Sequence, residues 1–133
     1  MAERRFQIVQ IGMVRSPLKT VDQCPRQARE GAPEARIHID PRYEAALEGL
    51  APGNEIWVMT WLHLDDRSLL RDHPRGDPEN PMRGVFSTRS PHRPNPIGLH
   101  KTRFVAFESP LTIRVAPLEV VDQTPVVDIK SVI

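Results

Sequence analysis

The sequence predicts a mainly β protein, namely a small antiparallel β-barrel with long loops and one short helix. The chain has 133 residues, 39 % of them hydrophobic, which suffices for one modest core and one domain over residues 1–133. Its 14 prolines are about twice the usual share and exclude a helical bundle, because proline interrupts helices and central strands. The apolar residues fall into about seven short segments, which is typical of strands.

The first half of the chain contains three of these strands and the helix. Phe6–Val14 and Arg36–Asp40 alternate apolar and polar residues, as half-buried strands do, and the long polar loop Ser16–Ala35 separates them. An acid followed by proline at positions 40 and 41 predicts a helix start, so a short helix is expected over Pro41–Leu47. Glu55–Leu64 is nearly all apolar, which indicates a strand buried on both faces or central in the sheet.

The second half begins with a charged, proline-containing excursion over Asp65–Pro81. The strands expected after it are Gly84–Thr88, Ile97–Glu108, Leu111–Val115, Leu118–Val121 and Val126–Ile129. Strands this short and this closely spaced favour antiparallel pairing and closure into a barrel.

Positive charge gathers in one part of the chain, although the net charge is only +1. No acid occurs between Glu79 and Glu108. The basic residues of this gap are Arg83, Arg89, Arg93, Lys101 and Arg103. A local basic segment in a balanced chain indicates a site for an anion such as phosphate or carboxylate. It also fits an exposed strand that carries arginines for solubility.

The densest motif is Gly84–Leu99, which is expected to form a strand, a rigid loop and a second strand. Its prolines fix φ and bias the residues before them to extended backbone. The loop can therefore hold Arg89, His92, Arg93 and Asn95 in fixed directions. Such a set suits phosphate, carboxylate or a base edge, and the alternative is a rigid solvent-facing connection.

Three further features carry less information. The turn Val121–Pro125 can either bond its own backbone or present Asp122 to a polar ligand. The spacing of His63, Asp65, Asp66 and His73 fits no known ligand set, so no metal is expected. The single cysteine, Cys24, excludes an intrachain disulfide framework and is a weak candidate for a nucleophile.

Four stretches, taken in order, resemble the tRNA-methyltransferase O family, also called TsaA-like. They are Ile11–Pro17, Pro25–Gln27, Gly84–Leu99 and Val121–Lys130, and together they span nearly the whole chain. The resemblance implies a single β-barrel that binds S-adenosylmethionine and forms a homodimer with the cofactor near the subunit contact. It also implies N6-methylation of threonylcarbamoyladenosine at position 37 of a tRNA, so the expected partner is the anticodon stem-loop.

The resemblance also carries over site residues, position by position. The cofactor-binding positions are Pro25, Arg26, Gln27, His63, Leu64, Arg89, Leu99, Val121, Asp122, Gln123 and Thr124. Arg93 and Asn95 are assigned to substrate binding or to loop architecture. The catalytic base is unknown, with Asp122 and His63 as candidates.

Two departures from the family pattern stand out. Gln123 occupies a turn position where the family usually has glycine, and a positive φ there would cost Gln roughly 1 kcal/mol or more. The chain ends at Ile133, whereas longer members carry a C-terminal domain associated with the tRNA. The N-terminus lacks the apolar region of a signal peptide, so a cytoplasmic location is expected, with neither membrane nor DNA as a partner.

Other functions fit parts of the same pattern. A non-catalytic RNA-binding β-barrel would need no cofactor, but an aromatic content of 5 % provides few platforms for base stacking. A methyltransferase acting on a different RNA or on a small molecule is a second alternative. A protein that only senses S-adenosylmethionine is a third.

Overall fold

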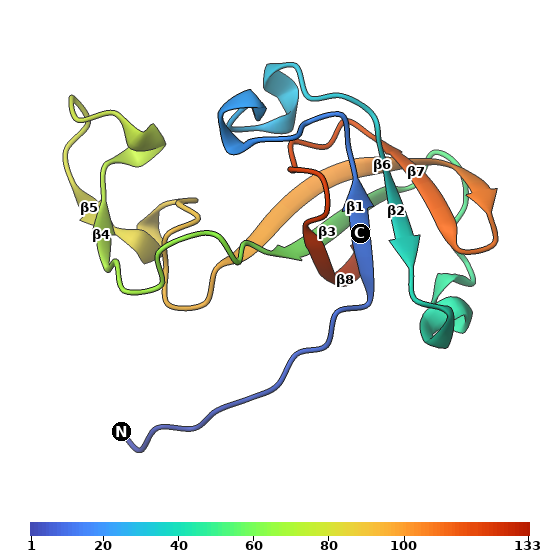
Figure 1. The fold of residues 1–133 in the computed structure, drawn as a ribbon, viewed down its shortest axis with the longest axis horizontal. Helices are drawn as coiled ribbons and strands as arrows, with labels where there is room; N and C mark the ends of the chain where they lie inside the picture. The colour runs from blue at the N-terminus through green and yellow to red at the C-terminus, as the bar shows by residue number, and fades with distance from the viewer.

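The computed structural model describes residues 1–133, and its main body is a closed barrel of six strands (Figure 1). Neighbouring strands follow the order β1-β2-β7-β6-β3-β8, and every pair is antiparallel. The strands are β1 (Gly12–Arg15), β2 (Ala35–Ile39), β3 (Glu55–Trp61), β6 (Ile97–Ser109), β7 (Thr112–Ala116) and β8 (Pro125–Ser131). The predicted antiparallel barrel is therefore confirmed.

Residues 65–96 form a lobe that extends away from the barrel (Figure 1). It contains a ribbon of two short strands, β4 (Arg71–Asp72) and β5 (Arg83–Gly84), and two 3₁₀ helices, η4 (Pro74–Gly76) and η5 (Val85–Ser87). The other 3₁₀ helices are η1 (Val21–Gln23), η2 (Ala28–Glu30) and η3 (Pro41–Leu47). None of these helices is long and apolar enough to cross a bilayer.

Helix η3 is the short helix that the sequence predicts, with the same bounds. The Asp40 carboxylate accepts a hydrogen bond from the backbone N–H of Arg42 at 2.9 Å, and Pro41 occupies the first helical position. Proline there costs no hydrogen bond, because the first N–H groups of a helix lack partners inside it.

The barrel interior holds the hydrophobic core. Strand β3 buries Ile56, Val58 and Thr60, while the residues between them are partly covered. This strand therefore buries one face fully rather than both, which corrects one reading of Glu55–Leu64. The other core residues include Val14, Ile37, Phe104, Ile113, Val115, Leu118 and Val126.

Three predicted strands differ in the structure. Phe6–Val14 forms backbone hydrogen bonds only from Ile11 onward, where the Ile11 N–H donates to the Val126 carbonyl at 2.9 Å, and the Phe6 side chain is exposed. Gly84–Thr88 leaves its ribbon after Gly84 and turns into η5, where the Thr88 N–H donates to the Val85 carbonyl.

The third corrected strand is Leu118–Val121. Its backbone bonds to the loop over residues 16–34 instead of to a strand. The Leu118 N–H donates to the Pro33 carbonyl at 2.9 Å, and the Asp122 N–H donates to the Leu18 carbonyl at 2.7 Å. This pairing holds the long first loop against the end of the barrel that also carries the turn at 121–125.

Candidate functional site

Arg93 holds the loop over residues 84–99 together from inside. Its Nε donates to the Ser90 carbonyl at 2.7 Å, and its Nη2 donates to the carbonyls of Val85 and Thr88 at 2.6 and 2.8 Å. A guanidinium that bonds three carbonyls of its own loop fixes that loop without a regular element beneath it. Of its two predicted roles, the geometry favours loop architecture for Arg93.

The same loop is tied to both strands that flank it. The Arg89 guanidinium donates to the Leu99 carbonyl, so two predicted cofactor residues touch. The Leu62 N–H, at the end of β3, donates to the Pro96 carbonyl at 2.8 Å. This bond brings the exposed residues His63 and Leu64 to the edge of the loop.

Other residues of the 65–96 lobe form hydrogen bonds or ion pairs with the loop over residues 84–99 and with the long first loop over residues 16–34. The Ser90 hydroxyl donates to the Asp72 carboxylate at 2.7 Å and lowers the pKa of that carboxyl. Arg67 donates to the Pro94 carbonyl and, at 3.3 Å, to Asn95 Oδ1. Asn95 therefore also has a structural partner.

The lobe reaches the segment Pro25–Gln27 as well. Arg75 forms an ion pair with Glu30 at 2.8 Å, and the Arg26 guanidinium lies beside Gly76. The first predicted cofactor segment therefore lies between the barrel and the lobe.

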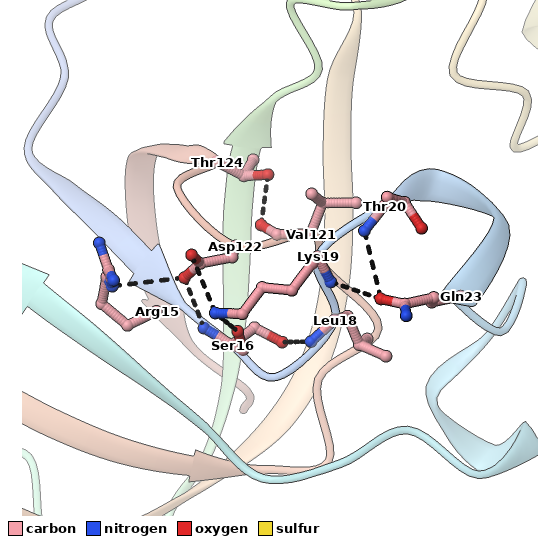
Figure 2. A network of polar contacts seen from close by, with 9 residues as sticks. All are labelled: Arg15, Ser16, Leu18, Lys19, Thr20, Gln23, Val121, Asp122 and Thr124. Carbon is pink, nitrogen blue, oxygen red and sulfur yellow. Dashed lines mark hydrogen bonds and ion pairs between the residues drawn. The ribbon is translucent and has the colours of Figure 1, made fainter.

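Asp122 is the centre of a polar network that joins the turn at 121–125 to the first loop (Figure 2). Its Oδ1 accepts from the Ser16 N–H at 2.9 Å and lies 3.3 Å from Arg15 Nε. Its Oδ2 accepts from Lys19 Nζ at 3.1 Å. The Asp122 side chain is only 8 % exposed, so both oxygens are bound within the protein.

These contacts decide the acidity of Asp122. Burial raises the pKa of this carboxyl, but the hydrogen bonds from Ser16 and Lys19 and the positive charges of Arg15 and Lys19 outweigh it and lower the pKa. A carboxylate with a lowered pKa and engaged oxygens is a weak proton acceptor. The network therefore favours a positioning role for Asp122 over the role of general base.

Gln123 adopts φ 70°, the left-handed conformation that the sequence comparison with the family glycine anticipates. Its N–H donates to the Val14 carbonyl at 2.7 Å, and the Thr124 hydroxyl donates to the Val121 carbonyl at 2.7 Å. These bonds keep the turn in place despite the strain that a side chain carries at positive φ.

Replacing Gln123 by glycine should raise the free energy of unfolding by up to about 1 kcal/mol, because glycine adopts this φ without strain. The melting temperature should rise by a few degrees. Thermal unfolding of the variant and the wild type measures the effect. Destabilisation by the substitution would show that contacts of the Gln123 side chain outweigh the strain.

A second buried network consists of residues that the sequence analysis does not predict. His100 on β6 bonds Glu119 Oε1 through Nδ1 at 2.6 Å and Thr60 Oγ1 through Nε2 at 2.8 Å. The three residues are far apart in sequence, so only the strand pairing of β3 with β6 and the path of residues 117–124 bring them together. Inward-facing polar residues in strands that are otherwise apolar are the signal that could have found them.

The site has groups that suit S-adenosylmethionine, which carries a carboxylate, an ammonium, hydroxyls and an adenine amine. The exposed guanidinium of Arg26 and the remaining donors of Arg89 can bind a carboxylate. Glu119 Oε2 is buried and has no hydrogen-bond partner, so it can accept from an amine or a hydroxyl. A hollow of about 340 Å³ near Tyr43 and Ile129 contains none of the predicted site residues.

Comparisons with known proteins identify relatives of this chain. A probable S-adenosyl-L-methionine-binding protein of Methanothermobacter thermautotrophicus is 44 % identical over 98 % of this chain and 92 % of its own length. The tRNA (adenine(37)-N6)-methyltransferase of Escherichia coli is 34 % identical over 94 % of this chain and 57 % of its own length.

The crystal structure of TrmO from Pseudomonas aeruginosa matches with a TM-score of 0.77 and 28 % identity, over 98 % of this chain and 57 % of that one. The chain thus spans just over half the length of that structure and of the Escherichia coli enzyme. The model of the tRNA-methyltransferase O N-terminal domain matches residues 13–133. Because this model covers most of the chain, the chain belongs to the tRNA-methyltransferase O N-terminal domain family.

Proposed function

We propose that residues 1–133 form an S-adenosylmethionine-dependent methyltransferase domain that methylates N6 of the adenosine at position 37 of a tRNA. The observation that supports this most directly is that the predicted cofactor segments lie in or beside three connections, β1 to β2, β3 to β6 and β7 to β8. Because neighbouring strands are antiparallel, these three connections share one end of the barrel. The names of the Methanothermobacter and Escherichia relatives support the cofactor and the reaction. The barrel differs from the doubly wound sheet that usually binds nucleotides.

The cofactor supplies a methyl group that is already activated by its sulfonium, so the protein has to align donor and acceptor and to accept one proton. Arg26 and Arg89 are placed to bind the carboxylate end of the cofactor. The acceptor nitrogen of a threonylcarbamoyl group belongs to a urea, so it needs a base. With Asp122 committed to its network, exposed His63 is the better candidate for that base.

The tRNA surface in this proposal includes the 65–96 lobe. Within the lobe, Arg75 pairs with Glu30 and His92 lies near Asp65, which leaves Arg71 and Arg83 on β4 and β5 without an acid partner. Both arginines are exposed on adjacent strands. Exposed arginines without an acid partner are suited to contact phosphates of the anticodon stem.

Substituting alanine for both Arg71 and Arg83 should weaken tRNA binding roughly tenfold at moderate salt and lower the slope of log K against log salt by about 1–2. Filter binding at several salt concentrations measures both quantities. Arg103→Ala is the matched control, because Arg103 is an exposed arginine on the barrel strand β6, outside the lobe. Equal slopes of log K against log salt for the double variant and the control would show that the lobe does not contact the tRNA.

The proposed function is tested first by titrating the protein calorimetrically with S-adenosylmethionine and S-adenosylhomocysteine, and then by following label from S-adenosylmethionine into tRNA. Binding near one per chain with transfer to N6 of adenosine 37 supports the proposal. Binding without transfer favours a sensor or a different acceptor, and tRNA binding without cofactor favours the non-catalytic barrel.

The proposal includes two finer features. A homodimer is expected to form the active unit, and sedimentation of the protein with and without cofactor measures its mass. A cytoplasmic location follows from the tRNA substrate, and cell fractionation tests it.

A further inference from the structure

Thr60, His100 and Glu119 form a buried chain of hydrogen bonds whose last atom is free. An ionised carboxylate only accepts, so His100 Nδ1 donates to Glu119 Oε1 at 2.6 Å. In the neutral imidazole Nε2 then accepts from the Thr60 hydroxyl at 2.8 Å. The side chains of His100 and Glu119 are 9 % and 11 % exposed, and Thr60 is fully buried. Glu119 Oε2 is shielded from solvent and has no partner.

The chain of bonds is built into the barrel. Thr60 pairs with Gly98 across β3 and β6, and the imidazole of His100 lies over Gly98. A Cβ on Gly98 would overlap Thr60 Oγ1 and lie 2.7 Å from His100 Nε2. The absence of a side chain at position 98 therefore makes room for the bond between Thr60 and His100.

Each end of the network adjoins a predicted cofactor segment. His100 follows Leu99, whose carbonyl binds Arg89. Glu119 lies two residues before Val121, at the start of the turn that Asp122 fixes. Burial raises the pKa of the Cys24 thiol, next to Pro25, and the negative charge of Glu119 adds to that increase. A buried, unpartnered carboxylate oxygen at this junction is costly unless a ligand donates to it.

We propose that Glu119 is a further cofactor-binding residue, whose Oε2 accepts a hydrogen bond from an amino or hydroxyl group of S-adenosylmethionine. His100 and Thr60 are positioning residues, because they hold the carboxylate through Oε1 and leave Oε2 free. This inference rests on the proposed function and adds a residue to its cofactor site.

Calorimetric titration of Glu119→Gln with S-adenosylmethionine and S-adenosylhomocysteine tests the role of Glu119. Glutamine keeps the shape but replaces one acceptor oxygen by a donor, so both ligands should bind roughly 10- to 100-fold more weakly. Both should lose affinity equally, because they share their amino and hydroxyl groups. Unchanged affinity, or a loss for S-adenosylmethionine alone, would overturn the assignment. A wild type that binds neither ligand would instead contradict the proposed function.

Thr60→Val tests the positioning role without removing volume from the core. It should weaken cofactor binding roughly three- to tenfold in the wild type and add nothing in the Glu119→Gln background, because Thr60 acts only through the carboxylate. Thr102→Val is the matched control: Thr102 is buried on the same strand as His100, and its hydroxyl has no hydrogen-bond partner. Equal losses for Thr60→Val and Thr102→Val, or additive losses in the double variant, would contradict the positioning role.

Discussion

Asp122→Ala should lower the free energy of unfolding by roughly 2–3 kcal/mol. The substitution leaves the N–H of Ser16, a residue only 5 % exposed, without its acceptor. It also removes the partner of Arg15 and Lys19, but these ion pairs contribute less because both cations are largely exposed. Chemical denaturation of both proteins at neutral pH measures the difference.

Asp122→Asn is the matched control, because asparagine keeps an oxygen for the Ser16 N–H and loses the charge and the acceptor for Lys19. It should cost about 1 kcal/mol. If the alanine and asparagine variants lost equal stability, the hydrogen bond to Ser16 would not be the main contribution.

The difference in stability between the wild type and Asp122→Asn should depend on pH in a definite direction. The folded protein lowers the pKa of Asp122 below the ordinary value of 3.8, so the ionised form stabilises the fold. The stability advantage of the wild type over Asp122→Asn should therefore be constant above about pH 4 and shrink as the pH falls further. A difference that grew with acidification would contradict the network.

Much of the fold could be predicted from the sequence because its signals are local. Alternating apolar residues at Ala35–Ile39 identify the inward face of β2, and Asp40 with Pro41 identifies the start of η3. The positive φ at Gln123 could be anticipated as well, but only because the resembled family usually has glycine at this turn position.

The errors have a common physical cause, namely that a strand also needs a partner. Phe6–Val14 has the pattern of a strand, but residues 6–10 have no backbone partner. Leu118–Val121 is apolar enough for a strand, but the first loop takes up the hydrogen bonds of the residues at its ends. The local sequence pattern of a segment does not show whether another segment offers backbone groups for it to pair with.

The site was predictable only where the family motif provides it. Arg89, Leu99 and Asp122 belong to motif segments; Arg89 bonds to Leu99 within its own segment, and Asp122 bonds to Ser16 of the first motif stretch. Thr60, His100 and Glu119 lie outside any local pattern, because their contacts depend on the register of β3 against β6. A network of this kind becomes visible only when the barrel is closed.

Gly98→Ala should be strongly destabilising. The added Cβ overlaps Thr60 Oγ1, and it would have to displace the imidazole of His100 as well. Overpacking a core typically costs about 1–3 kcal/mol, and breaking a buried pair such as His100 with Glu119 adds to this cost. The variant should lose roughly 3 kcal/mol or more of unfolding free energy, measured by denaturation, and bind S-adenosylmethionine at least tenfold more weakly.

Gly84→Ala is the control that distinguishes the effect of a glycine-to-alanine change as such from the effect of the clash at position 98. Gly84 has φ −59°, and nothing lies within 4 Å of the position of an added Cβ. Alanine there should leave stability unchanged or raise it by about 0.5 kcal/mol, because it reduces the entropy of the unfolded chain. If Gly98→Ala were equally harmless, the imidazole of His100 would have room to move, and Glu119 Oε2 would not be held in the fixed position that its proposed hydrogen bond to the cofactor requires.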